Sequence, residues 1–440
     1  MKFYSTNNKN LRVNIKQALF LGQAPDKGLF MPEKIPKISE NTICSFKNMK
    51  YPEIAFDVLK KFFKDISENY LRRISKDAYN FSIPVEEVDS KYILRLDQGP
   101  TASFKDFAAR MMAGLFDYYL AEDNKKLLIL VATSGDTGSA AADAFFGKEN
   151  IDVCILFPKN EVSVRQRKQM TTLGKNIFPV LVSGKFDDCQ DFVKKAFSDP
   201  DLKSINLSSA NSINIGRLLP QSVYYFYAYS RIADFPEKVV FSVPSGNFGD
   251  LMGGVIAKEM GLPVDRFIAA VNENDEFERF LKSGTYEKLS PSRECMSNAM
   301  NVGHPSNLAR LIDLYGGNMD EKGNIKKMPD MKKMREDFFS VSVSDEQTIK
   351  TIKNAYEKHA LVLEPHGAVA WRGAEVFKTK NKTIVFETAH PAKFPEILKQ
   401  FNIGIKVPES IALILDKRES YETIQNYYGS FKRLLAGKYL

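Results

Sequence analysis

The amino-acid sequence predicts an α/β fold in which mainly parallel sheets are covered by helices. Short, continuously apolar runs alternate with stretches of helical spacing, and such runs are typical of strands buried on both faces. Two of the runs end in glycine-rich turns that lead directly into a helix, an order that favours parallel strands. The six predicted strands lie at residues 127–132, 153–157, 180–182, 239–243, 267–271 and 383–386.

The two glycine-rich turns have a sequence that suits a small anionic ligand. The first, at residues 133–138, reads TSGDTG, and the second, at residues 244–250, reads PSGNFGD. Glycines allow the backbone to turn tightly, and the free N–H groups at the start of the next helix favour a phosphate. Neither turn contains G-x-G-x-x-G or the Walker lysine pattern, which argues against a dinucleotide or ATP site. Each turn is also an ordinary connection between a strand and a helix.

A lysine between two phenylalanines is the main candidate for chemistry. Lys105 lies in the stretch GPTASFKDF at residues 99–107, where a helix of apolar periodicity begins. Burial disfavours the ammonium form, so such a lysine becomes a nucleophile that forms a Schiff base with a carbonyl compound such as pyridoxal phosphate. Most of the 62 Lys and Arg residues must be solvated, so Lys105 depends on its context for this interpretation.

A third polar segment, SANSINIGR at residues 209–217, lies where the flanking sequence turns apolar. It concentrates amides, hydroxyls and one arginine, Arg217. An arginine with side-chain amides nearby can clamp an anion. The same residues are also typical of a capped helix start, and the segment alone leaves both interpretations open.

Together these segments resemble the threonine synthase family, whose members are pyridoxal-phosphate enzymes of fold type II, the tryptophan-synthase β-like fold. The resemblance is carried by GPTASFKDF at 99–107, ATSGDTG at 132–138, NSIN at 211–214, SVPSGNFGD at 242–250 and TAHPAKF at 388–394. Near the N-terminus, DKGLFMP at 26–32 resembles the leader domain that threonine synthases carry and most other members of the fold lack.

The resemblance implies a division of the chain into domains. A small N-terminal domain is expected at residues 1–80 and a catalytic core at residues 81–440, with the cofactor in the cleft between two lobes. The smaller lobe is expected at about 101–232 and the larger at about 233–400. The tail at 401–440 carries apolar side chains that predict an amphipathic helix packed on the core.

The activity that the resemblance implies is conversion of O-phospho-L-homoserine and water to L-threonine and phosphate, the last step of threonine biosynthesis. The reaction is a β,γ-elimination and replacement that depends on pyridoxal 5'-phosphate. Lys105 is expected to hold the cofactor and then to shuttle protons, beginning with the α-proton. Groups that clamp the doubly charged substrate would also stabilise the departing phosphate.

The resemblance also assigns site residues one by one. Contacts with the cofactor are expected from Lys105, Asp136, Gly246, Asn247, Phe248, Gly249, Asp250 and Thr388. Contacts with the substrate are expected from Ser134, Thr137, Asn211 and Arg217. No metal ligand is expected, because the four histidines form neither HxxxH nor HExxH. Structural hydrogen bonds are favoured for His366 and His390 over proton transfer.

Asp136 departs from the pattern of the wider fold. Many relatives have an asparagine at this place, whose amide donates a hydrogen bond to the phenolic oxygen of the cofactor. An ionised aspartate cannot donate, and it would face a partly anionic oxygen. Asp136 is therefore expected to be protonated, to turn away, or to contact the cofactor indirectly.

Composition agrees with a cytoplasmic globular enzyme. The net charge is +8, but the basic residues are spread along the chain, which favours a solvated surface over a nucleic-acid site. The four cysteines form no CxxC pair, and Cys154 lies in an apolar run, so core packing in a reducing compartment is expected. No apolar run reaches the roughly 18 residues of a membrane helix, and the N-terminus lacks an apolar signal core. A monomer is favoured over a dimer.

Three alternatives remain open. A serine/threonine dehydratase or a cysteine-synthase-like enzyme would keep Lys105 and the phosphate turn, but the leader domain argues against both. A non-catalytic protein that binds the cofactor and a small phosphorylated ligand is disfavoured by Lys105 itself. A nucleic-acid-binding module would need a basic stripe interleaved with aromatic residues, and the sequence has none.

Overall fold

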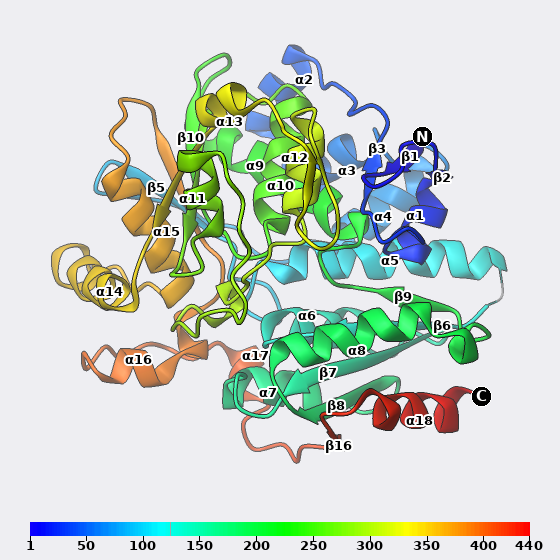
Figure 1. The fold of residues 1–440 in the computed structure, drawn as a ribbon. Coiled ribbons are helices and arrows are strands. Elements are labelled where there is room, and N and C mark those ends of the chain that lie inside the picture. The colour runs from blue at the N-terminus through cyan, green and yellow to red at the C-terminus, as the bar shows by residue number, and fades with distance from the viewer. Residues whose placement is uncertain (124) are drawn as a thin grey trace.

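Residues 1–123 and 125–440 are described by the computed structural model. Their strands form two large sheets, a three-stranded antiparallel sheet near the N-terminus and a two-stranded hairpin. Figure 1 shows the smaller of the two large sheets in the lower half of the view and the larger sheet above it, with helices packed on both. The predicted class, an α/β fold of mainly parallel sheets covered by helices, is confirmed.

The larger sheet is parallel except at one edge, where β4 and β5 form an antiparallel pair. From edge to edge it contains β14 (Phe338–Ser342), β11 (Val264–Val271), β10 (Val239–Pro244), β15 (Thr383–Glu387), β5 (Lys91–Arg95) and β4 (Val85–Val88). The last two strands precede the range predicted for the larger lobe.

The smaller sheet is parallel throughout. Its strands, in order, are β16 (Glu422–Gln425), β8 (Ile177–Ser183), β7 (Ile151–Pro158), β6 (Leu127–Ala132) and β9 (Leu207–Ser209). Every residue of β6 is buried, because successive side chains point to opposite faces and both faces are covered. Ile129 packs in the main core with the helix that follows β6, whereas Leu130 packs in a second cluster with Cys154 of β7.

The N-terminal part combines a small sheet with helices. Its strands are β1 (Lys2–Ser5), β2 (Arg12–Asn14) and β3 (Phe30–Pro32), and its helices are α1 (Ile15–Leu21), α2 (Glu40–Ser45), α3 (Tyr51–Leu59) and α4 (Glu68–Ala78). Asn14 begins α1 with a capping box, in which its side chain accepts from the N–H of Gln17. Aromatic side chains such as Phe46 and Phe56 join this part to the main core.

The helices of the catalytic region include two that begin at glycine-rich turns. Their bounds, up to the larger sheet, are α5 (Lys105–Asp123), α6 (Asp136–Phe145), α7 (Val164–Thr171), α8 (Phe186–Ser198) and α9 (Ile215–Ile232). The later helices are α10 (Gly249–Glu259), α11 (Glu276–Ser283), α12 (Leu308–Leu314), α13 (Met331–Asp337), α14 (Asp345–His359) and α15 (Pro365–Val376). Figure 1 shows α5 in cyan along the boundary between the two sheets.

The C-terminal segment returns to the smaller sheet. It contains α16 (Pro395–Lys399), α17 (Glu409–Ala412), the strand β16 and α18 (Tyr428–Tyr439). Phe431 and Leu435 of α18 are fully buried, and Phe431 stacks on Phe192 of α8 with ring centroids 6.2 Å apart. The predicted tail helix is confirmed, and β16, which pairs with β8, was not expected from the sequence.

The remaining elements of the described residues are four short helices and a hairpin. They are the 3-10 helices η1 (Phe46–Asn48), η2 (Pro200–Leu202), η3 (Asn298–Met300) and η4 (Pro391–Lys393), and the strands β12 (Asn318–Met319) and β13 (Ile325–Lys327). Among residues 1–123 and 125–440, no helix combines the length and the apolar character that a membrane crossing requires.

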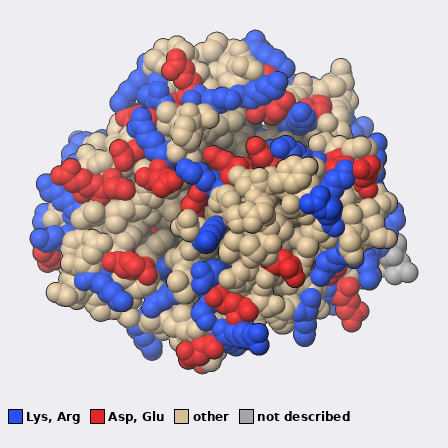
Figure 2. Space-filling model, turned by 60° about the horizontal axis from the view of Figure 1, so that its bottom comes forward, with Lys and Arg blue, Asp and Glu red and all other residues tan. Residues whose placement is uncertain are grey.

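All six strands predicted from the sequence are present, with the same or slightly wider bounds. Cys154 is buried in the middle of β7, as its apolar surroundings indicated. Figure 2 shows one face of the molecule, on which acidic and basic residues are interspersed rather than gathered in a basic stripe.

Candidate active site

A cavity lies at the carboxyl ends of β6, β9, β10 and β15, where ligands bind in open parallel sheets. Its wall includes every residue that the sequence resemblance assigned to a cofactor or a substrate. These are Lys105, Ser134, Asp136, Thr137, Asn211, Arg217, Gly246, Asn247, Phe248, Gly249, Asp250 and Thr388. The structure thus brings together segments that are distant in the sequence.

Lys105 is the first residue of α5 and opens on this cavity. Its Nζ lies 4.0 Å from the centroid of the Phe104 ring. Burial lowers the pKa of Lys105 to about 8, while the nearby carboxylate of Asp136 raises it and the guanidinium of Arg217 lowers it. A minority of Lys105, about a tenth at pH 7 but far more than of an ordinary lysine, is therefore unprotonated, in the state that attacks a carbonyl carbon.

Asp136 is buried at the N-terminus of α6. Its partners exclude the first of the three possibilities that the sequence left open, a protonated carboxyl. Its Oδ1 lies 2.7 Å from Nζ of Lys393 and accepts a hydrogen bond from Nε2 of Gln166 at 2.9 Å. Burial opposes ionisation, but Lys393 and Lys105 outweigh it and hold the pKa of Asp136 below its ordinary value. Asp136 is therefore ionised rather than protonated.

The turn before α6 is held by the side chain of its first residue, Thr133. The hydroxyl of Thr133 accepts from the N–H groups of Gly135 and Gly138, both at 2.9 Å. Gly135 has φ of +142°, and a Cβ there would lie 2.4 Å from Cδ of Gln166. Only glycine fits this position, because the backbone conformation and the contact with Gln166 both exclude a side chain.

The turn before α10 is supported from behind. Phe248 adopts a left-handed conformation with φ of +59° immediately before the first helical residue, Gly249. Oδ1 of Asn247 accepts from the N–H of Ser306 at 2.6 Å, and its carbonyl accepts from the amide of Asn307 at 2.9 Å. The first N–H groups of α10 have no partner within the helix, so this turn can bind an anion such as a phosphate.

Asp250, in the first turn of α10, has an asymmetric environment. Its Oδ1 accepts from the hydroxyls of Tyr224 at 2.6 Å and Tyr225 at 3.0 Å. Its Oδ2 is buried and has no hydrogen-bond partner among the described residues. Burial raises the pKa of Asp250 to about 6, against the opposing effect of the two tyrosine hydroxyls. Asp250 is therefore a carboxyl that can change its protonation near neutral pH.

Arg217 is a buried cation that faces the cavity. Its Nη1 donates to the carbonyl of Ala210 at 2.6 Å, and its Nε has no partner among the described residues. Within residues 1–123 and 125–440 it forms no ion pair with an acidic side chain, and burial lowers its pKa to about 10. An uncompensated buried guanidinium is unfavourable unless an anion binds it, so Arg217 is a strong candidate for substrate binding.

Asn211 lines the same cavity, but its amide is already engaged. Its Nδ2 donates to the carbonyl of Ala132 at 2.7 Å, and its Oδ1 accepts from the N–H of Ala132 at 3.2 Å. These contacts fasten the end of β6 to the segment after β9. Asn211 therefore has a structural function in addition to any contact with a ligand, whereas Ser134 and Thr137 make no such backbone bridge among the described contacts.

Thr388 and His366 also line the cavity, and His390 lies close to Thr388 in the sequence. The carbonyl of Thr388 accepts from the N–H of Phe104 at 2.9 Å, which fixes the residue before Lys105. His366 lies between Glu364, which pairs with its Nδ1, and the N–H of Ala299, which donates to its Nε2 at 3.1 Å. Nδ1 of His390 accepts from the N–H of Ala392 at 3.1 Å. Both histidines thus make structural hydrogen bonds, as expected.

Sequence reasoning assigned no role to Lys393 or Arg310. Lys393 is in the stretch 388–394, which could have drawn attention to it. Arg310 lies in α12 and is fully buried, and no local pattern points to it. Its guanidinium donates to the carbonyls of Phe30 at 3.1 Å, Ser212 at 3.0 Å and Ile213 at 2.6 Å. Arg310 therefore links the N-terminal part to the segment that contains Arg217.

Three family models match the chain. They are described as "Threonine synthase N terminus" at residues 2–79, "Pyridoxal-phosphate dependent enzyme" at 84–386 and "Threonine synthase, C-terminal" at 367–434. A threonine synthase from Buchnera aphidicola subsp. Acyrthosiphon pisum is 39% identical over 445 residues and covers 100% of both chains. The chain belongs to the threonine synthase family.

Solved threonine synthases have the same fold. The structure from Escherichia coli has a TM-score of 0.90 and 36% identity, with 100% of both chains covered. The structure from Brucella melitensis, described with pyridoxal phosphate bound, has a TM-score of 0.92 and 33% identity over 99% of both chains. Family models named for threonine synthase match both ends of the chain, which favours this family over the dehydratases. The chain is thus a pyridoxal-phosphate-dependent enzyme, and the predicted cofactor is confirmed.

The cavity of this family member fits that cofactor. Lys105 supplies an amine of lowered pKa, and the turn before α10 supplies free N–H groups for a phosphate. Thr388 places a hydroxyl in the same wall, and among the described residues the buried Oδ2 of Asp250 has no partner. The cavity thus contains a group complementary to the aldehyde, to the phosphate and to the ring nitrogen of pyridoxal phosphate.

Proposed function

We propose that this member of the threonine synthase family converts O-phospho-L-homoserine and water to L-threonine and phosphate. The observation that carries the proposal is the buried, uncompensated guanidinium of Arg217 in the same cavity as Lys105. A substrate with a carboxylate and a phosphate supplies the anions that this cavity lacks. A serine or threonine substrate would offer one anion fewer.

In this proposal Lys105 attaches the cofactor covalently and, once released by the substrate amine, takes the α-proton. The cofactor supplies an electron sink that stabilises the carbanion formed next to the substrate nitrogen. The pKa of Lys105, lowered to about 8 mainly by burial, suits an amine that gains and loses a proton within one turnover. Thr388 is assigned to the ring nitrogen, where its neutral hydroxyl does not force protonation of the ring.

The remaining contacts follow from charge. The turn formed by Gly246, Asn247, Phe248 and Gly249, at the start of α10, is assigned to the cofactor phosphate, supported by the free N–H groups there. Arg217 is assigned to an anionic group of the substrate, with Ser134 and Thr137 beside it. A cation at the leaving phosphate stabilises charge that develops in the transition state.

We also propose that the chain acts as a monomer in the cytoplasm, with domains at 1–80 and 81–440. All four cysteines are free and Cys44 is exposed, which suits a reducing compartment. The domain boundary is supported by the family models that match 2–79 and 84–386. Sedimentation of the purified holoenzyme at the mass of one chain is the expected result, and a stable dimer would contradict it.

The proposal is tested by measuring phosphate and threonine formed from O-phospho-L-homoserine, together with the near-visible spectrum. The wild type is expected to be yellow and to release both products in equal amounts. Lys105→Ala is expected to lose the activity and the band, while Lys258→Ala, which lies outside the cavity, keeps both. A yellow but inactive wild type would contradict the proposed substrate, and a Lys105→Ala protein that keeps the band would contradict the role of Lys105.

A further inference from the structure

A second lysine, Lys393 of η4, is completely buried close to Lys105. Its Nζ lies 2.7 Å from Oδ1 of Asp136 and donates to the carbonyl of Thr101 at 2.7 Å. A buried ammonium is stable only when it is paired and hydrogen-bonded, and Lys393 satisfies both conditions. No role in the proposed reaction has been assigned to it so far.

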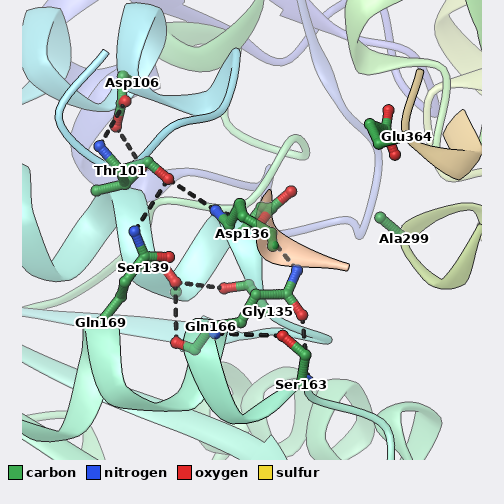
Figure 3. A network of polar contacts seen from close by, with 12 residues as sticks. Thr101, Asp106, Gly135, Asp136, Ser139, Ser163, Gln166, Gln169, Ala299 and Glu364 are labelled. Atoms are coloured by element: carbon green, nitrogen blue, oxygen red, sulfur yellow. Dashed lines mark hydrogen bonds and ion pairs between the residues drawn. The ribbon is translucent and has the colours of Figure 1, made fainter. Parts of the chain in front are cut away.

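The carboxylate of Asp136 is fixed from three directions. Lys393 and Gln166 both meet Oδ1, and Gln166 is held in turn because its Oε1 accepts from the N–H of Ser163 at 3.2 Å. The N-terminus of α6 adds the favourable field of the helix dipole. Figure 3 shows this network around Asp136, Gln166 and Ser163. Asp136 therefore presents a negative charge at a defined place in the cavity wall.

The ion pair joins the two sides of the site. Asp136 follows β6 of the smaller sheet, whereas Lys393 follows β15 of the larger sheet. The carbonyl of Thr101, which Lys393 contacts, also accepts from Nε2 of Gln169 in α7 at 3.0 Å. Thr101 lies four residues before Lys105, in the segment that leads into α5. The pair thus fixes a charge between both sheets and the segment that carries the reactive amine.

Four charged groups in and behind the cavity wall act on the amine of Lys105. Asp136 and Asp250 favour its protonated form, whereas Arg217 and Lys393 disfavour it. Asp136 has the largest effect of the four. Because Lys393 holds Asp136 in place and is itself a cation, removal of either partner of the pair must change the proton affinity of Lys105, in opposite directions.

We propose that Lys393 is a positioning residue for Lys105: its ion pair with Asp136 fixes a carboxylate beside the Lys105 amine and sets the pH at which that amine becomes a free nucleophile. This inference rests on the proposed attachment of the cofactor to Lys105. The pair also explains why an aspartate occurs here where many relatives of the wider fold have an asparagine. In this chain the negative charge has a dedicated buried cation.

The test uses full-length protein from which the cofactor has been removed. Pyridoxal phosphate is added over a range of pH, and the rate of its covalent capture is followed by near-visible absorbance. In this step the neutral amine adds to the aldehyde carbon and the aldehyde oxygen leaves as water. The rate therefore rises with the fraction of neutral Lys105.

Asp136→Asn removes the negative charge but keeps an oxygen for Gln166, so the midpoint of the pH profile is expected to fall by about one unit or more. Lys393→Met removes a cation and leaves Asp136 with Gln166 and Lys105 as partners, so the midpoint is expected to rise, by less than Asp136→Asn lowers it, because Lys393 acts more weakly on Lys105 than Asp136 does. The double variant is expected to return toward the wild-type midpoint. A loss of packing alone would impair both single variants in the same direction.

Lys258→Met is the matched control, because Lys258 forms an ion pair with Asp337 at 2.6 Å outside the cavity. Its midpoint is expected to equal that of the wild type. Shifts in the same direction for both single variants, or none in either, would overturn the inference. If Lys393→Met cannot be purified, an unchanged or raised midpoint in Asp136→Asn overturns it, and a lowered one supports it. Covalent capture that persists in Lys105→Ala would instead refute the proposed role of Lys105.

Discussion

Replacement of Gly135 by alanine is expected to be among the more damaging single-methyl additions in this chain. At φ of +142° an L-residue is strained by about 1–3 kcal/mol. The new Cβ would also lie 2.4 Å from Cδ of Gln166, which is fully buried, and overpacking of this kind adds about 1–3 kcal/mol. The sum is a loss of about 2–6 kcal/mol in the free energy of unfolding. Displacement of Gln166 also removes the hydrogen bond to Asp136.

Gly147→Ala is the matched control. Gly147 also has positive φ, +75°, but a Cβ there meets nothing within 4 Å, so only conformational strain of about 1–2 kcal/mol is expected. Urea unfolding of both variants, with cofactor affinity measured by near-visible titration, separates the two effects. Gly135→Ala is expected to unfold at lower urea and to bind the cofactor more weakly. Equal unfolding midpoints and unchanged affinity in the two variants would refute the reasoning.

Two further predictions concern buried polar groups. Arg310→Met is expected to destabilise the fold by about 3–5 kcal/mol, because several buried acceptors lose their donor, and to raise the Michaelis constant. Urea unfolding and steady-state kinetics check this against Arg335→Met, a control that removes contacts at the surface; similar losses in both would contradict it. Burial raises the pKa of Asp106 to about 7 in the folded protein, so folding favours the protonated carboxyl. The contribution of Asp106 to the free energy of unfolding is therefore complete below pH of about 4, the pKa in the unfolded chain, and is lost as the pH rises to about 7. The stability of the wild type relative to Asp106→Asn should therefore fall over this interval, and a constant difference would contradict the assignment.

The strands that could be predicted from the sequence are those in which nearly every residue is apolar, because both faces of the strand are buried. A strand covered on both faces, such as β6 or β10, is a continuous apolar run and needs no partner to be recognised. By contrast, β5 begins and ends with a charged residue, and β16 reads ETIQ with three exposed positions. Their strand conformation depends on pairing with β15 and β8, which no local window of sequence contains.

The same distinction applies to the site. The glycine turns and Lys105 could be located because a tight turn before a helix is a local feature of the chain. The pairing of Asp136 with Lys393 could not, because it joins residues from two sheets. Whether Asp136 is ionised could not be decided from the sequence, because its partner Lys393 was not known. The hydrogen bond from Asn211 to Ala132 could not be predicted for the same reason, although both residues lie in recognisable motifs.

The place of β16 has a consequence for how the chain is made. During synthesis the strand β8 is complete long before residues 422–425 leave the ribosome, so its outer edge must wait with unpaired backbone groups. Such an edge is a template for pairing with other chains until β16 closes it. Loss of β16 is therefore expected to cause aggregation of newly made protein before it changes catalysis.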